Sequence, residues 1–236
     1  MTLKVLQMIK RLCFSILLVM LATLTPVYAF QESDLTTKAP PCKGKVSGPL
    51  KDNRGFSIPN PRWVDIKGNG ICEVIGSEGS FLNSTIIADP NFYYFKKNGG
   101  YESFPRFGSK ILAIYYLKNG GAPYFVEQGE RGGGAFISRW NAKENKFDIP
   151  ISKKERYAIL RFHVHFMVLQ ALKQIRNDNM KDVDLYGEMV GKIADEATAF
   201  SYGEAEIKYF TGSYEALLNA ISEANSGLPG RRKKAK

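Results

Sequence analysis

His163 and His165 are the only histidines of this 236-residue chain. Their spacing of two places them about 200° apart on a helix but on one face of a strand. Neighbouring apolar residues recur at helical spacing, so we expect both on the flanks of an amphipathic helix, unable to share a metal ion. A Ser-His-Asp or Cys-His nucleophile would need one of them, and no G-x-S-x-G segment accompanies them. Acyl-transfer hydrolysis therefore has little support.

The most specific ion-binding candidate is the segment Asp65-Ile-Lys-Gly-Asn-Gly-Ile-Cys-Glu-Val-Ile. It resembles the D-x-N-G-D-G-x-x-D loop of FG-GAP and VCBS propeller repeats, which can hold calcium through side-chain oxygens and one main-chain carbonyl. The resemblance implies oxygens from Asp65, Asn69 and Glu73 and a carbonyl from Ile71. Lys67 stands at the third position and has no acceptor. We therefore favour a structural turn without metal, with calcium as the alternative and no other cofactor indicated.

The resemblance continues more weakly over residues 61–149. About fifty residues after the first loop, the glycine turn and following strand recur at 116–126 without the acidic ligands. A propeller needs four or more blades. The resemblance thus implies local strand–turn–strand geometry rather than a complete propeller.

Aromatic residues are densest between residues 93 and 107. Packed in a sheet they would form core, whereas exposed rings would make a platform for a glycan or protein. On the second interpretation the candidate partner contacts are Tyr93, Tyr94, Tyr101 and Arg106.

The amino end has the order of a bacterial secretory signal peptide. Basic residues precede an apolar run, and small residues suit cleavage after Ala29. We expect residues 1–29 to be removed and the remainder to be periplasmic or secreted, with no transmembrane segment left. An uncleaved anchor is the alternative.

Cys42 and Cys72 are the cysteines that remain after the predicted signal peptide. An exported protein meets an oxidising compartment, so we expect a disulfide between them. Closing a loop of this length would stabilise the fold by roughly 3 to 4 kcal/mol.

The formal net charge of +10 does not indicate nucleic-acid binding. Three of these charges lie in the predicted signal peptide and five in the tail, which leaves +2 for residues 30–230. We expect residues 227–236 to be a disordered basic tail, or to touch anionic surfaces.

Residues 30–60 are rich in Pro, Gly and Lys and predict an irregular lead-in. Residues 61–151 predict short strands between glycine-rich turns. The expected strands are Arg62 to Ile66, Cys72 to Gly76, Asn91 to Lys96, Lys110 to Leu117, Pro123 to Gln128, Ala135 to Trp140 and Lys146 to Ile149.

Residues 152–226 predict a helical region. Ser152 and Glu155 fit a capping box at the start of the first helix. A second apolar set runs from Val183 to Phe200, and Ser213 could cap a third helix after Gly212. The chain therefore predicts an α+β fold, with antiparallel, degenerate propeller-blade-like hairpins packed against a bundle of about three helices.

These features favour a binding protein over an enzyme, because no catalytic set is evident. We expect an inhibitor-like or immunity-like protein that recognises a protein or cell-envelope partner. One alternative is an envelope hydrolase that uses dispersed carboxylates with or without a metal. The other is a structural component of an envelope or secretion assembly.

Overall fold

The structure, a computed structural model, describes residues 30–77, 87–88, 90–95, 101–103, 110–128, 135–147, 151–177, 179–180 and 182–227. The predicted signal peptide, Arg106 and the tail beyond Gly227 lie outside these ranges, as does the side chain of Tyr94. None of the described helices combines the length and apolar character that a membrane crossing needs. The predicted α+β fold is confirmed, with antiparallel sheets followed by three helices.

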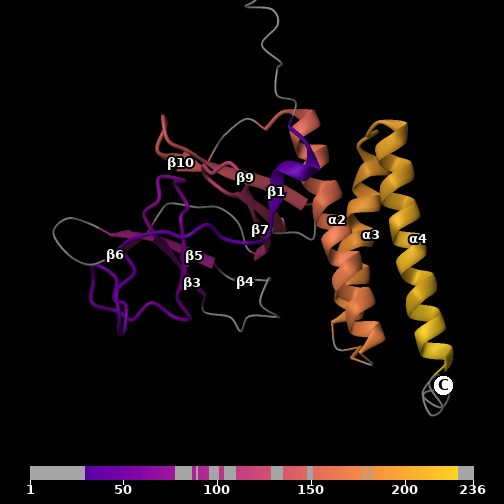
Figure 1. The fold of residues 1–236 in the computed structure, drawn as a ribbon, viewed down its shortest axis with the longest axis horizontal. Coiled ribbons are helices and arrows are strands. Elements are labelled where there is room, and N and C mark those ends of the chain that lie inside the picture. The colour runs from indigo at the N-terminus through magenta and orange to yellow at the C-terminus, as the bar shows by residue number, and fades with distance from the viewer. Residues whose placement is uncertain are drawn as a thin grey trace, which may run out of the picture. The chain divides into compact units, whose positions relative to one another are not determined.

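The larger sheet contains six strands, all paired antiparallel (Figure 1). Strand β7 is apolar and mostly buried, as expected for a central strand. The strand order is β1 (Leu35–Thr36), β7 (Lys110–Leu117), β8 (Tyr124–Gln128), β9 (Ala135–Asn141) and β10 (Lys146–Phe147), with β4 (Ile87–Ala88) also paired to β7. A short 3-10 helix, η1 (Glu32–Asp34), precedes β1.

The smaller sheet has four antiparallel strands in sequential order, β2 (Arg62–Val64), β3 (Glu73–Ser77), β5 (Pro90–Phe95) and β6 (Tyr101–Ser103). Strand β6 was not expected from the sequence. The preceding lead-in is largely irregular, and the predicted disulfide joins Cys42 within it to Cys72 beside β3. This crosslink holds the lead-in against the smaller sheet.

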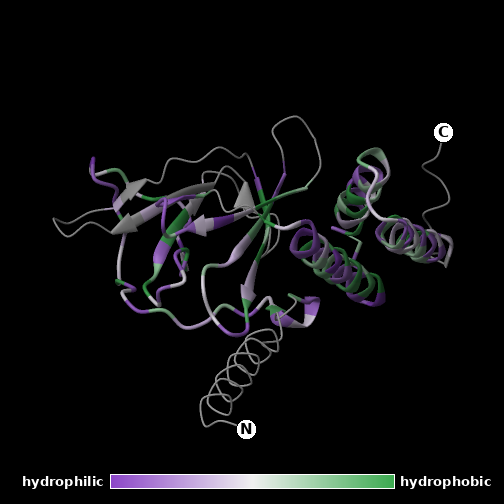
Figure 2. Cartoon of the chain, turned by 90° about the horizontal axis from the view of Figure 1, so that it is seen from above, coloured by the Kyte–Doolittle hydropathy of each residue, from purple (hydrophilic) through white to green (hydrophobic). Residues whose placement is uncertain are grey.

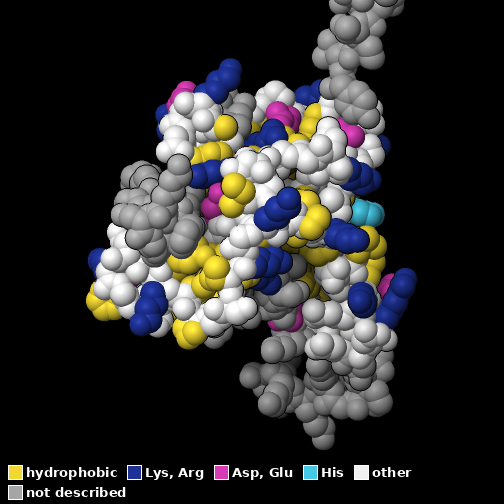
Figure 3. Space-filling view, turned by 60° about the vertical axis from the view of Figure 1, so that its left-hand side comes forward, with side chains coloured by type: hydrophobic (Ala, Val, Ile, Leu, Met, Phe, Trp, Pro, Cys, Tyr) yellow, Lys and Arg dark blue, Asp and Glu magenta, His cyan; other side chains and the backbone are white. Residues whose placement is uncertain are grey.

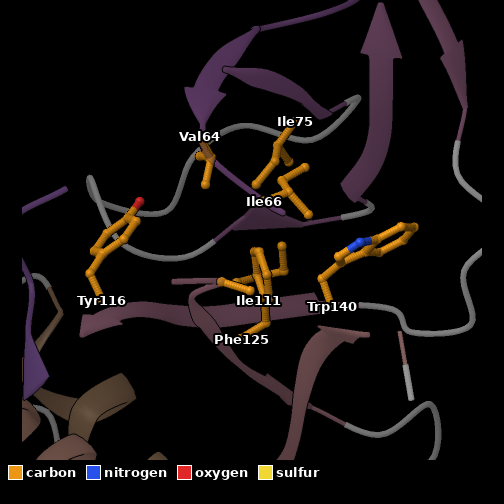
Figure 4. Close-up of a cluster of buried hydrophobic side chains, with 8 residues drawn as sticks. Val64, Ile66, Ile75, Ile111, Tyr116, Phe125 and Trp140 are labelled. Carbon is orange, nitrogen blue, oxygen red and sulfur yellow. The ribbon is translucent and has the colours of Figure 1, made fainter. Parts of the chain in front are cut away.

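Apolar side chains from the two sheets form a shared core. Val64, Ile66 and Ile75 point toward Ile111 and Phe125 of the larger sheet (Figure 4). All five are at most 3 % exposed. Burial of such side chains contributes roughly 1.5 to 3 kcal/mol each, so this cluster is what holds the sheets together.

The helical region consists of α2 (Lys153–Arg176), α3 (Val183–Ala199) and α4 (Glu204–Gly227), each with both hydrophobic and hydrophilic positions (Figure 2). Ser152 caps α2 as predicted, because its Oγ accepts a hydrogen bond of 3.2 Å from the amide of Glu155. The Glu155 carboxylate instead accepts a hydrogen bond from the Tyr124 hydroxyl of β8. A tertiary contact has thus replaced half of the expected capping box.

The predicted start of the third helix is wrong. Helix α4 begins at Glu204, so Gly212 lies inside it and Ser213 donates to the carbonyl of Tyr209 at 2.7 Å. Burial of Phe210 explains the earlier start, since its side chain is fully buried and anchors the first turns. Packing outweighs the cost of about 1 kcal/mol for a glycine within a helix.

Glu196 of α3 joins the helices to the larger sheet. Its buried carboxylate accepts hydrogen bonds from Arg156 of α2 at 2.5 Å, from Tyr202 at 2.6 Å and from the amide of Ala135 at the start of β9 at 2.8 Å. Arg156 also donates to the Ala135 carbonyl at 3.0 Å. A buried charge needs such partners, so this network ties α2, α3 and β9 together.

Candidate functional site

A cavity of about 290 Å³ lies where the segment after β1, strand β2, strand β7 and helix α2 meet. Its walls are rich in aromatic rings, among them Trp63, Tyr115, Tyr116 and Phe166. Within the described lining Arg62 is the one charged residue, and none is acidic. An apolar cavity with a single cation suits a ligand that joins apolar groups to one anionic group.

The cavity lies at the edge of β7 rather than over one of its faces. Four consecutive residues, 113–116, border it. Side chains alternate between the two faces of a sheet, so a cavity over one face would touch every second residue. Contact with four residues in a row is the pattern of a strand edge.

Among the described residues, this edge of β7 is paired at its two ends and unpaired between them. Strand β4 pairs with Lys110 and Ile111, and β1 pairs with Tyr116 and Leu117. Across the ranges that the structure describes, no strand pairs with the same edge at residues 112–115. The opposite edge is occupied by β8 as far as Tyr115.

The side chain of Thr36 explains why β1 stops short. Its Oγ1 accepts a hydrogen bond of 3.1 Å from the amide of Lys38, the donor that would otherwise continue the ladder to Ile114. The amide of Lys118 donates a hydrogen bond of 2.9 Å to the carbonyl of Asp34, so the backbone groups of Lys118 point toward this edge. By the alternation of backbone groups along a strand, the N–H and C=O of Ile114 face it too.

Arg62 is half-buried among these apolar walls. Burial lowers the pKa of its guanidinium, and the charge interaction with Tyr116 opposes that change. Burial also raises the pKa of Tyr116 to about 12. Since an arginine keeps its charge in proteins, Arg62 presents a partly desolvated cation to the cavity, where an anion would be held more strongly than on an open surface.

Tyr115 connects the cavity to a buried histidine. Its hydroxyl and Nδ1 of His163 share a hydrogen bond of 2.6 Å, while its ring packs edge-on against Phe162 and Phe166. Burial lowers the pKa of His163 to about 3. The prediction that both histidines flank the helix is therefore wrong for His163, which is 1 % exposed, and holds for the exposed His165.

The carboxylates of the predicted calcium loop bind backbone amides. Asp65 accepts hydrogen bonds from Asn69 at 3.0 Å and from Gly70 at 2.7 Å. Glu73 accepts from the amides of Ile66 at 2.8 Å and Lys67 at 3.4 Å. Burial raises the pKa of Glu73 to about 7, against the opposing effect of these hydrogen bonds and of Lys67.

The other two predicted ligands also take part in the turn. The Asn69 side chain accepts from the amide of Ile71 at 3.0 Å, and Ile71 forms a parallel bridge with Lys43. Among the described residues no three His, Cys, Asp or Glu side chains gather as a metal site. Calcium takes six to eight oxygens, so these contacts favour the structural turn, and calcium binding stays a prediction.

The loop packs closely on the turn between β7 and β8. Gly68 has a φ of +68°, and a Cβ at this position would lie 1.9 Å from the Ala122 nitrogen. The ammonium of Lys67 lies 5.5 Å from the centroid of the Trp140 ring. The segment that suggested ion binding is thus a close contact between the two sheets.

The predicted aromatic contacts separate into two groups. Tyr101 is 4 % exposed, packs edge-on against Trp63 and belongs to a small core, and Tyr93 packs against the same core while half-buried. Both fit the core interpretation. The side chain of Tyr94 and all of Arg106 lie outside the described residues, so their role as partner contacts stays a prediction.

Comparisons with protein-family models, with curated proteins and with solved structures found no match to this chain. The resemblance to FG-GAP and VCBS loops therefore stays a prediction. Sequence reasoning missed the cavity altogether. Arg62 and Ile114 belong to no motif. The local signal was Thr36, because a threonine side chain can bind the backbone and end a strand.

Proposed function

We propose that this protein is an exported binding protein that holds a carboxylate-bearing peptide segment of a partner protein in the cavity beside β7. The observation that carries the proposal is the placement of Arg62 among Trp63, Tyr116 and Phe166, with no acidic residue in the described lining. A hydrolase of the expected kind would need two carboxylates in its cleft. Binding therefore ranks ahead of catalysis.

The charge of the segment that supplies half of the cavity lining agrees with an anionic ligand. Residues 37–70 contribute five lining residues and contain seven Lys or Arg and two Asp or Glu, a formal charge of +5 in a body that carries +2 overall. The face in Figure 3 shows Lys and Arg side chains beside hydrophobic ones, with fewer acidic groups. Such a surface steers acidic partners toward it and raises the association rate.

Two features support an extracytoplasmic location. The order of charged, apolar and small residues before residue 30 is that of a signal peptide. The disulfide between Cys42 and Cys72 is of a kind that persists in oxidising compartments. A periplasmic or secreted partner follows from this location.

Selection of a random displayed peptide library on the purified protein tests the proposal. We expect enriched peptides to combine a carboxylate with apolar residues. The substitution Arg62→Gln should weaken the best peptide at least about tenfold, because a charge-assisted hydrogen bond to a partly buried cation contributes roughly 1.5 to 3 kcal/mol. Isothermal titration calorimetry measures the change.

Arg54→Gln is the matched control. Arg54 is an exposed arginine of the same basic segment, its side chain is 75 % exposed and it does not line the cavity. It should alter affinity less than about twofold, since exposed charges contribute little. Equal weakening by both substitutions, or enrichment of peptides without carboxylates, would refute the proposal.

A further inference from the structure

Residues 37–42 run from one sheet to the other along the cavity. They follow β1, which pairs with the larger sheet, and end at Cys42, whose disulfide joins Cys72 beside the smaller sheet (Figure 1). Thr37 and Ala39 line the cavity and are also exposed to solvent, so this segment is an outer wall of the cavity. We infer, beyond the proposed function, that residues 37–42 form a strap that closes the cavity while the disulfide is intact and opens it when the disulfide is reduced.

The strap itself makes few contacts that would hold it in place. At its start the amide of Lys38 donates to Oγ1 of Thr36 at 3.1 Å. Among the contacts of the described residues, none is a hydrogen bond made by residues 39–42. Pro40 and Pro41 have no N–H to donate, and successive prolines favour an extended, semi-rigid chain. The strap is therefore a stiff link that depends on its two ends.

At the far end the disulfide acts together with two backbone hydrogen bonds. The amide of Lys43 donates to the carbonyl of Gly70 at 2.9 Å, and the amide of Cys72 donates to the carbonyl of Lys43 at 2.8 Å. Lys43 and Gly70 are exposed, so water competes for these bonds and their net contribution to stability is small. The covalent bond between Cys42 and Cys72 keeps the pair together. Without it this end of the strap should open locally.

A dithiol reductant would release the strap by thiol–disulfide exchange. Its first thiolate attacks the sulfur of Cys42, because Cys72 is only 3 % exposed, and Cys72 leaves as a thiolate. The second thiol of the reductant then displaces Cys42. The reductant becomes a disulfide, and two electrons and two protons pass to the two cysteines. The loop from Asp65 to Glu73 keeps its own hydrogen bonds and should stay folded.

Limited trypsin digestion distinguishes the strap from the loop that shares its disulfide. Lys38 lies in the strap and Lys67 in the loop, and cleavage at each site requires a locally open segment. The double variant Cys42→Ser/Cys72→Ser represents the reduced state without exposing the protease to a reductant. We expect it to be cleaved after Lys38 at least about tenfold faster than the wild type, and after Lys67 at a rate changed less than about twofold. Equal acceleration at both sites, or none after Lys38, would overturn the inference.

Tryptophan fluorescence reports on the cavity wall and the core separately. Trp63 and Trp140 are the two tryptophans of the chain. Trp63 lines the cavity, whereas Trp140 is 3 % exposed in the core between the sheets. In Trp140→Phe, dithiothreitol should raise the acrylamide quenching constant of Trp63 at least about twofold, because the strap opens. In Trp63→Phe, quenching of Trp140 should not change. An unchanged constant at Trp63 would show that the cavity stays closed, and a rise at both would show general unfolding; either would overturn the inference.

Discussion

The loop from Asp65 to Glu73 and the edge of β7 that borders the cavity differ in how they use their polar groups. In the loop, both carboxylates accept amides from their own neighbourhood, and the turn is packed against the other sheet. At the edge, Ile114 directs its backbone groups toward a cavity that also contains Arg62. The loop has the residue types of a binding site, but the edge has the geometry of one.

Residue type alone is therefore a weak guide to function. Asp, Asn, Glu and Gly at short spacing serve equally to hold a cation and to satisfy the amides of a tight turn. A strand edge has no such residue signature, because every residue carries the same backbone donor and acceptor. Three experiments test the contrast, in order of decreasing effect on stability.

The free energy of unfolding should depend on pH through His163, which shares a hydrogen bond with Tyr115 of β7. His163 has a folded pKa of about 3 and a usual value of 6.5. The unfolded chain therefore binds the proton first, and stability that is complete above pH 6.5 is lost as the pH falls toward 3. The expected slope is about 1.4 kcal/mol per pH unit, which amounts to about 5 kcal/mol over the whole range.

Urea unfolding between pH 3 and 8 measures this slope. His163→Asn offers a non-titrating acceptor to Tyr115 and should lose most of the slope, while being less stable at pH 8. His165→Asn is the control, because His165 is exposed, and it should behave as the wild type. A slope that survives in His163→Asn would place the acid sensitivity elsewhere.

The loop should tolerate a methyl group at one glycine and not at another. Gly68 and Gly70 both have positive φ, but a Cβ at Gly68 would collide with the backbone of Ala122, whereas nothing lies within 4 Å at Gly70. Gly70→Ala should cost about 1 kcal/mol from backbone strain. Gly68→Ala should cost about 3 kcal/mol or more, because overpacking is added.

The unfolding midpoint in urea gives both values. The two variants share a loop and a change of residue, so their difference isolates the contact between the sheets. Similar losses would show that the loop is not closely packed, which would remove its structural role.

The smallest effect concerns the loop carboxylate. Asp65→Asn keeps one oxygen acceptor and loses the other, at a cost of about 1 kcal/mol. Millimolar calcium should leave the thermal midpoint of the wild type unchanged, because the amides of Asn69 and Gly70 already engage both Asp65 oxygens. Calcium that stabilised the wild type and not Asp65→Asn would make the loop a cation site and reverse the comparison.

The elements were largely predictable from local pattern. The apolar run of β7, the Ser152 cap and the helical spacing of α2 and α3 are short-range signals, and the structure confirms them. The start of α4 was missed because burial of Phe210 is a tertiary effect that overrides the signals at Gly212 and Ser213. Burial of His163 was missed for the same reason, since it depends on Tyr115 from a distant strand.

The linear chain was enough to predict the longer strands and their place before the helices, the pairing of Cys42 with Cys72 and the basic character of residues 37–70, because periodicity, count and charge are properties of sequence alone. Tertiary structure alone decided that the Asp65 loop would satisfy its own amides and that β1 and β4 would pair with the two ends of one edge of β7. Strand pairing joins residues far apart in the chain through identical backbone groups. No local pattern of side chains therefore marks where a ladder stops.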